Sequence, residues 1–379
     1  MFTDKAKSIF TKGYGFLRSH PQIHFVLIAV VLAVLFYAPY SSVIPGDGST
    51  NTHLAIMVTY AIAALGINLL LGFSGLISLA TAGFMGVGAL GLVVLMNDFP
   101  IPFSDSTGLP FFVAMLVILT LSGVLGALVG IISLRVQGIY LAITTLFVAQ
   151  ILHTFFTNYS RWFGDSGSGI RLEGSEPGIS GLLLFGGRVE LIRAMPYSIA
   201  NTFNFDRYYL LLMLTGALLL VMIVTYHIIK SRTGRAFMAM SRSYNAAQAM
   251  GINVVKYRVM SFVIATMIAS FAGIMFAVWN QSVANDRWSL MISLTVIAVV
   301  VVGGLKSITG TLIGAFVIYA FPRIFLDFLT DFNIVGGLLI VLVILFYPNG
   351  LVHIAYDVRR LIARIRMKLF KKGRVNVDD

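Results

Sequence analysis

The sequence predicts an all-α, polytopic integral membrane protein with about ten transmembrane helices, and three observations support this fold class. Hydrophobic residues make up 58% of the 379 residues and charged residues 11%, a balance typical of chains that reside in lipid. Apolar runs of about 20 residues, the length that spans a bilayer, recur along the whole chain. Glycines interrupt several of these runs, which predicts that some of the helices are broken.

Each apolar run is expected to form one spanning helix. The first five cover residues 24–44, 53–72, 76–96, 111–133 and 138–157. Five more cover residues 207–229, 259–280, 289–303, 308–326 and 334–348. The transmembrane domain therefore extends over 24–348, between an N-terminal tail at 1–23 and a basic C-terminal tail at 349–379.

The distribution of charge predicts the orientation of these spans. Basic residues precede the first span, at Lys5, Lys7, Lys12 and Arg18. They also fill the C-terminal tail, at Arg359, Arg360, Arg364, Arg366, Lys368, Lys371, Lys372 and Arg374. The positive-inside rule then places both tails in the cytoplasm. The net charge of +12 is thus a sign of topology, and no nucleic-acid partner is expected.

Two hydrophilic segments separate the spans. Residues 158–206 form an external loop of mixed charge, long enough to expect a functional role. Residues 230–258 lie on the cytoplasmic side and carry Lys230, Arg232, Arg235, Arg242, Lys256 and Arg258 with no acidic residue. The positive-inside bias accounts for their charge but not for the length or the helical, alanine-rich character of this second segment.

Small residues mark close helix packing and two breaks. Gly126 with Gly130, and Gly310 with Gly314, have the four-residue spacing that lets helix backbones approach. Residues 72–75 and the doublet Gly303–Gly304 interrupt apolar runs in both halves of the chain. Such interrupted segments indicate discontinuous helices that line a path, whose freed backbone groups must be satisfied by protein or water.

The chain lacks the usual means of powering transport itself. No Asp or Glu lies in the middle of a span, which argues against an ion-coupled carrier. The stretch GGLKS at 303–307 lacks the second glycine of a phosphate-binding loop and its strand-loop-helix setting. The absence of cysteine excludes thiol catalysis and cysteine metal sites, and no metal site is expected. Any ATP must therefore be hydrolysed by another subunit, for which 230–258 is the only internal cytoplasmic docking segment of sufficient size.

An enzymatic alternative rests on the tetrapeptide GFSG at 72–75. It fits the G-x-S-G pattern of rhomboid-type intramembrane serine proteases, in which a serine pairs with a histidine of a later helix. Ser74 and His227 would be that pair. The pattern is weak in a chain with 36 glycines.

From about residue 53 to 351 the chain resembles the permeases of ABC importers for branched-chain amino acids, in particular the LivM-type subunit. The segments that carry this resemblance are GINLLLGFSGLISLATAGFMGVGAL (66–90), LRVQGIYLAITTLFVAQIL (134–152), SRTGRAFMAMSRSYNAAQAMGINVVKYRVMSFVIATMIASFAGIMFA (231–277), GGLKSITGTLIGA (303–315) and LFYPNGL (345–351). The third is the most specific, because NAAQAMG (245–251) is similar to the E-A-A-x-x-x-G signature of importer permeases.

The resemblance implies an ABC importer permease architecture in the bacterial inner membrane. Its partners would be a second, LivH-like permease, two LivG- and LivF-like ATPases that use ATP and Mg, a periplasmic substrate-binding protein that docks near 158–206, and lipid. The chain itself would bind no cofactor and would be no enzyme. The cargo would be branched-chain or other hydrophobic amino acids, with urea or short amides as the alternative.

Two sets of residues follow from these considerations. The ATPase-coupling set is Gly234, Arg235, Asn245, Ala246, Ala247, Ala249 and Gly251. Alanines favour a helix that fits a groove, and Gly251 is expected to end it in a left-handed conformation. Asn245 replaces the glutamate of the signature, so it is given no electrostatic role. The substrate-path set is Asn68, Ser74, Ser78, Thr144, Thr145, Gln150, Gly303 and Gly304; each polar member also fits a hydrogen bond between packed helices.

Overall fold

The computed structural model describes residues 49–97, 111–136, 138–163, 170–171, 205–280, 282–284, 286–325, 345 and 350–351. The predicted span 24–44, nearly all of 334–348, both tails apart from residues 350–351, and most of the loop 158–206 lie outside this part of the chain. Within it the fold is helical, apart from two-residue strands β1 (Ile170–Arg171) and β2 (Ser282–Val283), which pair antiparallel. The predicted all-α class is confirmed.

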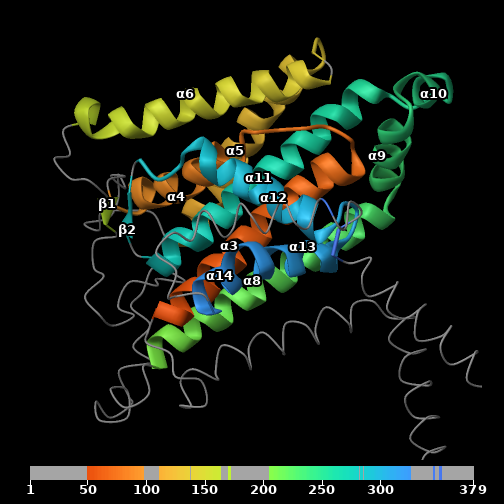
Figure 1. Ribbon diagram of the computed structural model, residues 1–379. Helices are drawn as coiled ribbons and strands as arrows, with labels where there is room; N and C mark the ends of the chain where they lie inside the picture. The colour runs from red at the N-terminus through yellow and green to blue at the C-terminus, as the bar shows by residue number, and fades with distance from the viewer. Residues whose placement is uncertain are drawn as a thin grey trace, which may run out of the picture.

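Every predicted span within the described residues contains a helix (Figure 1). The first half holds α3 (Ser49–Ile67), the π-helix η2 (Asn68–Phe73), α4 (Thr81–Asn97), α5 (Phe111–Ser133) and α6 (Ile139–Phe163). The second half holds α8 (Phe205–Lys230), α9 (Arg232–Arg242), α10 (Tyr244–Ala249), α11 (Val254–Asn280), α12 (Leu290–Gly303), α13 (Ile308–Ala315), the π-helix η4 (Phe316–Ala320) and α14 (Phe321–Phe325). Among the described helices, five are long and apolar enough to cross a membrane: α3 with η2, α5, α6, α8 and α11.

Three predicted boundaries were wrong. The span expected at 76–96 begins as a helix only at Thr81, and residues 75–80 before it form neither helix nor strand. Helix α6 continues to Phe163, so the first residues of the expected loop 158–206 are helical. Helix α11 begins at Val254, which brings the last residues of the segment 230–258 into a spanning helix.

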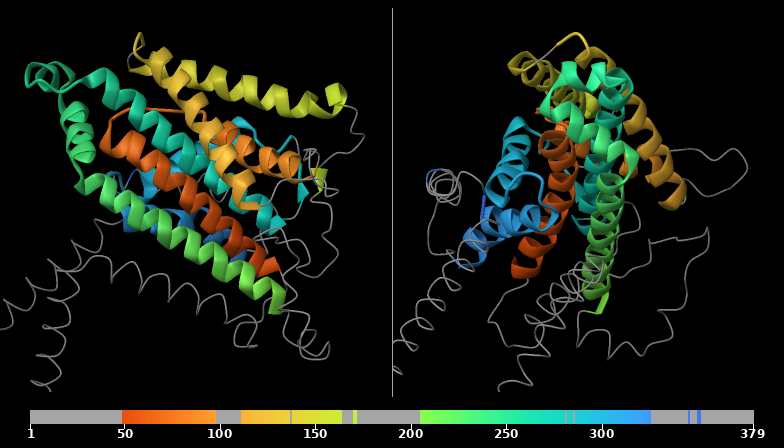
Figure 2. Two further views of the ribbon diagram at one scale, coloured as in Figure 1. Left: turned by 180° about the vertical axis from the view of Figure 1, so that it is seen from behind. Right: turned by 90° about the vertical axis from the view of Figure 1, so that its right-hand side faces the viewer.

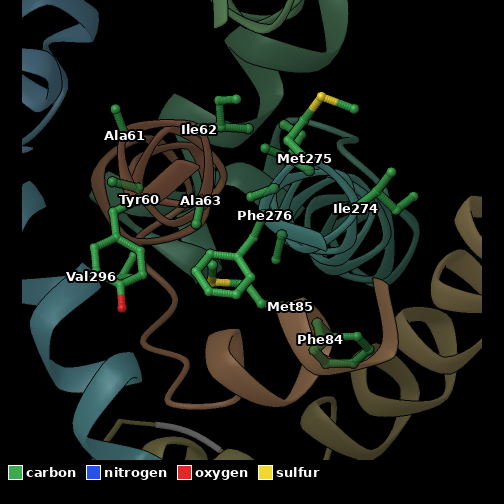
Figure 3. Packing of buried hydrophobic residues seen from close by; sticks show 14 of the residues in the cluster. Tyr60, Ala61, Ile62, Ala63, Phe84, Met85, Ile274, Met275, Phe276 and Val296 are labelled. Atoms are coloured by element: carbon green, nitrogen blue, oxygen red, sulfur yellow. The ribbon is translucent and has the colours of Figure 1, made fainter. Parts of the chain in front are cut away.

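The core is built around α3, α4 and α11, which lie side by side in both views of the bundle (Figures 1 and 2). Figure 3 shows Phe276 of α11 between α3 and the Phe84–Met85 turn of α4, with Tyr60 and Ala63 projecting from α3. Two glycines make this approach close. A Cβ on Gly88 would collide with the Ser270 carbonyl oxygen, and one on Gly273 would collide with that of Met85.

Short polar side chains hold α5 to this core. The Ser270 hydroxyl lies 2.6 Å from that of Ser122 and 2.8 Å from the Phe84 carbonyl oxygen. The Ser122 hydroxyl in turn donates to the Thr266 carbonyl oxygen at 2.9 Å. Gly126 packs directly on Thr266, which confirms the close contact that its spacing predicted. Because lipid offers no hydrogen-bond partners, buried hydroxyls must be satisfied in this way.

The outer helices expose apolar side chains. Along α5 these include Leu116, Leu121, Val124 and Leu128, and along α6 they include Ile143, Phe147 and Ile151. Continuous apolar faces of this size would be a liability in water and mark contact with lipid or another membrane protein. Their position on the bundle surface therefore agrees with a polytopic membrane protein.

Candidate functional site: the coupling segment and the two breaks

The coupling segment, residues 230–258, folds as two short helices that project from one end of the bundle (Figure 1). Helix α9 starts at a cap in which the Ser231 hydroxyl accepts a hydrogen bond from the Gly234 N–H. Gly234 is needed for this turn, because a Cβ there would collide with the carbonyl oxygens of Ile228 and Ile229. The chain can then turn from α8 into α9 within one residue.

Helix α10 carries the alanine-rich signature and has defined ends. The Ser243 hydroxyl accepts from the Ala246 N–H at 3.3 Å and caps its start. At its end Gly251 has φ +80°, its N–H donates to the Gln248 carbonyl oxygen, and the Ile252 N–H donates to that of Ala247. This pair of bonds is the Schellman motif, which favours glycine at the left-handed position. The predicted conformation of Gly251 is confirmed.

One face of α10 is left open. Ala247 is buried against the rest of the segment, whereas Asn245, Ala246 and Ala249 are exposed, and Met250 is 83% exposed. The exposed members are small or flexible, so this face can enter a shallow groove of a partner. The predicted alanine helix therefore presents a surface and does not pack into the bundle.

A basic groove lies beside α10, between α9 and the start of α11. Its volume is about 520 Å³, and its walls include Arg232, Arg235, Gly251 and Lys256. The Arg235 guanidinium donates to the Lys230 carbonyl oxygen at 3.1 Å. All three cationic side chains are exposed, and the segment contains no acid. The groove is thus electrostatically suited to acidic side chains.

The first break begins at residues 72–75, at the end of η2, and reaches α4 through residues 75–80, which form neither helix nor strand. Side chains from other helices replace the missing helical hydrogen bonds: Thr145 accepts from the Leu79 N–H at 2.9 Å, and Ser293 from the Ala82 N–H at 2.9 Å. Ser78 accepts from the Ala80 N–H, while the Ser74 hydroxyl donates to the Leu69 carbonyl oxygen. These partners satisfy the N–H groups of Leu79, Ala80 and Ala82 before the helical hydrogen bonds of α4 begin.

The second break covers residues 303–307 and is tied to the first by Asn68. The Asn68 amide donates to the Ser307 carbonyl oxygen at 3.0 Å and to the Thr311 hydroxyl at 2.8 Å. Its oxygen accepts from the Lys306 N–H at 2.9 Å. Lys306 has φ +65°, a conformation that costs a non-glycine residue roughly 1–2 kcal/mol. Asn68 thus stabilises an unfavourable turn.

Gly303 and Gly304 bring three chain segments into contact. A Cβ on Gly303 would collide with the Gly310 carbonyl oxygen, and one on Gly350 would collide with the Gly304 Cα. The Leu351 N–H donates to the Val302 carbonyl oxygen at 2.8 Å. The doublet therefore has a packing role in this structure; its predicted role in a substrate path is not tested by these contacts.

The predicted path residues fall into two groups. Asn68, Ser74, Ser78 and Thr145 are buried and lie at or beside the two breaks, with Gly303 and Gly304. Thr144 and Gln150 lie apart from them on α6, where Thr144 donates to the carbonyl oxygen of Tyr140 in its own helix and Gln150 is exposed. The structure therefore joins the two breaks but not every member of the set.

Sequence reasoning missed the position of Arg258. It was grouped with the cations that frame the coupling segment, yet its side chain is 4% exposed. A helical signal was present, because Arg258 follows buried Val254 by four residues and precedes buried Ser261 by three. That spacing puts all three on the inner face of α11. Ser293 and Thr311 were missed too, and nothing local distinguishes them from other hydroxyls in spans.

Comparison with known proteins relates this arrangement to a family. Residues 49–347 match the family described as "Branched-chain amino acid transport system / permease component". The chain belongs to this family. The permease is 28% identical over 342 residues to the high-affinity branched-chain amino acid transport system permease protein LivM of Salmonella typhimurium and to that of Escherichia coli, over 86% of this chain and 74% of each relative.

A shorter match links the permease to LivH of Salmonella typhimurium, with 29% identity over 135 residues, 35% of this chain and 44% of the relative. No solved structure matches the permease significantly. The family consists of transport subunits and not of enzymes, so the protease alternative with Ser74 and His227 is not favoured. The Ser74 hydroxyl already donates to Leu69 in its own segment. A urea or amide permease is not favoured either.

Proposed function

We propose that this permease imports branched-chain or other hydrophobic amino acids as one membrane subunit of an ABC importer, with the coupling segment as the contact for its ATPase. The observation that carries the proposal is the open face of α10 beside the basic groove. An exposed helix that is capped at its start and ended by a Schellman motif can follow a displacement of the ATPase without unfolding. The relatives named LivM and LivH support the cargo.

The proposal includes the remaining partners. A second, LivH-like permease would complete the path, two LivG- and LivF-like ATPases would bind ATP and Mg, and a periplasmic binding protein would deliver the amino acid. Both chain termini would be cytoplasmic, on the side of the coupling segment, by the distribution of basic residues. ATP-driven closure of the ATPases would move α9 and α10 and thereby favour a different state of the path.

Charge reversal in the basic groove tests the ATPase contact. In Arg235→Glu/Lys256→Glu, leucine uptake and co-purification of the ATPases should each fall at least about tenfold, which corresponds to about 1.4 kcal/mol of lost binding. Arg135→Glu is the matched control, because Arg135 is exposed at the α5–α6 turn and lies outside the groove. Its uptake should stay near that of the unmodified permease.

Normal uptake in the double variant, with the ATPases still bound, would contradict the proposed docking surface. The cargo is tested separately by measuring uptake in the presence of unlabelled leucine, isoleucine, valine or urea. Competition by the three amino acids and not by urea is the expected result; competition by urea alone would overturn the proposed cargo.

A further inference from the structure

A second cavity lies between the coupling segment and the first break. Its volume is about 180 Å³, and the polar part of its wall is made by Ser74, Ser241, Tyr244 and Arg258. Figures 1 and 2 show why such distant residues meet: α9 and α10, the start of α11 and the α5–α6 turn lie at the same end of the bundle. The cavity is distinct from the basic groove between α9 and α11, because the two share no lining residue.

Arg258 gives this cavity a positive charge that no acidic side chain of the described residues pairs with. Within the described residues its guanidinium makes one hydrogen bond, from Nη2 to the Val136 carbonyl oxygen at 2.6 Å, and its Nε has no partner. A guanidinium has five N–H groups to satisfy. No acidic side chain occurs in the coupling segment. Burial of a cation without a counter-ion is unfavourable, so the site is suited to an anion.

Two hydroxyls reinforce this preference. The side chains of Ser241 and Tyr244 make no hydrogen bond to the described part of the chain, and both line the cavity beside Arg258. Together with the guanidinium they offer donors from three different helices, α9, α10 and α11. A planar carboxylate with two oxygens matches such a set better than a spherical ion, because it can accept from the guanidinium and a hydroxyl at once.

The remaining wall is apolar. Leu76, Ile77, Leu141, Met240 and Val254 line the rest of the cavity. Contact between these side chains and a hydrocarbon group removes apolar surface from water and favours an amphiphilic ligand over phosphate or chloride. The cavity wall therefore combines one cationic side chain with several aliphatic ones.

We propose that this cavity binds a small aliphatic carboxylate, with the carboxylate on Arg258, Ser241 and Tyr244 and the hydrocarbon against Leu141 and Val254. The carried amino acid and the corresponding carboxylic acid without an amino group share this chemistry. Since the coupling segment has no acid to receive an ammonium group, the simple carboxylate should bind more tightly. The binding site is independent of the proposed function; only a regulatory effect on ATPase coupling would rest on it.

A thiol-protection experiment tests the site directly. The chain has no cysteine, so Met240→Cys places a single reporter thiol of this subunit in the cavity wall. Its modification by neutral N-ethylmaleimide is followed by mass spectrometry, with the full chain and its co-purified subunits in lipid nanodiscs. The probes are 4-methylpentanoate, leucine, leucinol and phosphate. Arg135→Cys is the control, because Arg135 is exposed and lines neither the cavity nor the basic groove.

Modification of the Met240→Cys thiol should slow about tenfold at a carboxylate concentration ten times the dissociation constant, because about one site in eleven is then empty. The simple carboxylate should act at a lower concentration than leucine, while leucinol and phosphate should not protect. Arg258→Gln should abolish protection and Arg258→Lys should retain part of it. An unchanged Arg135→Cys rate in these backgrounds shows that the Arg258 substitutions and the probes do not change the reagent or its general access to this end of the protein.

Three results would overturn the proposal: no protection by either carboxylate, equal protection by leucinol or phosphate, or full protection in Arg258→Gln. The readout involves neither uptake nor ATP hydrolysis. A normal result in the charge-reversal test of the basic groove would therefore remove the proposed ATPase contact without affecting the cavity, and the reverse also holds.

Discussion

Asn68 and Asn245 are the same residue type in opposite surroundings. Asn68 lies in the first turn of η2, is 1% exposed and uses both atoms of its amide to bind the second break. Asn245 lies in the first turn of α10 and is exposed. Asn68 therefore satisfies polar groups of the second break inside the protein, whereas Asn245 and its neighbours Ala246 and Ala249 on α10 are open to the outside.

This difference separates two mechanical roles. In the breaks, hydrogen bonds between η2 and α13 and between α6 and Leu79 fix the helix ends relative to one another. In α9 and α10 the side-chain and capping hydrogen bonds are local, as in the Ser231 and Ser243 caps and the Schellman motif. The segment therefore keeps its own shape without being fixed to the bundle by its outer face. A region that must receive a partner and a region that must hold the bundle together require these opposite arrangements.

Asn68→Leu should have the largest effect. It removes three hydrogen bonds and leaves the Lys306 N–H without its acceptor, which costs about 1–3 kcal/mol. The Ser307 carbonyl oxygen and the Thr311 hydroxyl keep their bond to each other, so each of their lost bonds costs only about 1 kcal/mol. The free energy of unfolding, measured by denaturant titration in detergent, should fall by about 3 kcal/mol or more. Asn245→Leu, the matched control, should change it by less than about 0.5 kcal/mol. Equal effects of the two substitutions would contradict the comparison.

Two adjacent threonines of α6 provide a smaller test. Thr145 is buried and accepts from the Leu79 N–H across the first break, whereas Thr144 bonds only within its own helix. Thr145→Val should lower the free energy of unfolding by about 1–2 kcal/mol, and Thr144→Val by less than about 0.5 kcal/mol. Uptake should fall in the first variant only. A larger fall in the free energy of unfolding in Thr144→Val than in Thr145→Val would show that the outer face of α6 contributes more to stability than the hydrogen bond across the first break.

The sequence predicted those features that depend on local pattern. Runs of apolar residues place the spans, because span length is set by bilayer thickness. The stop at Gly251 was predictable because few other residues adopt a positive φ at a helix end. The breaks at 72–75 and 303–304 were located because closely spaced glycines interrupt apolar helices.

The internal partners of those breaks were not predictable in the same way. Asn68 and Thr311 are 243 residues apart in sequence, and no local pattern indicates which hydroxyl or amide will face which turn. The late start of α4 at Thr81 depends on Thr145 and Ser293, which come from two other helices. Arg258 shows a related limit: charge counting includes it among surface cations, and only its position on the inner face of α11 reveals its burial.

Gly251→Ala changes the coupling segment and should have the smallest effect on the global free energy of unfolding. An alanine at φ +80° costs roughly 1–2 kcal/mol, since its Cβ approaches the carbonyl oxygen, whereas asparagine tolerates this conformation better. Nothing else is crowded, because no atom lies within 4 Å of a Cβ at this position. Amide hydrogen exchange at residues 250–252 should therefore become at least about fivefold faster in Gly251→Ala and less so in Gly251→Asn. Global unfolding should be nearly unchanged in both, because α10 makes only local hydrogen bonds. A large fall in global stability would mean that the coupling segment is part of the cooperative bundle, and the separation of the two regions would then be wrong.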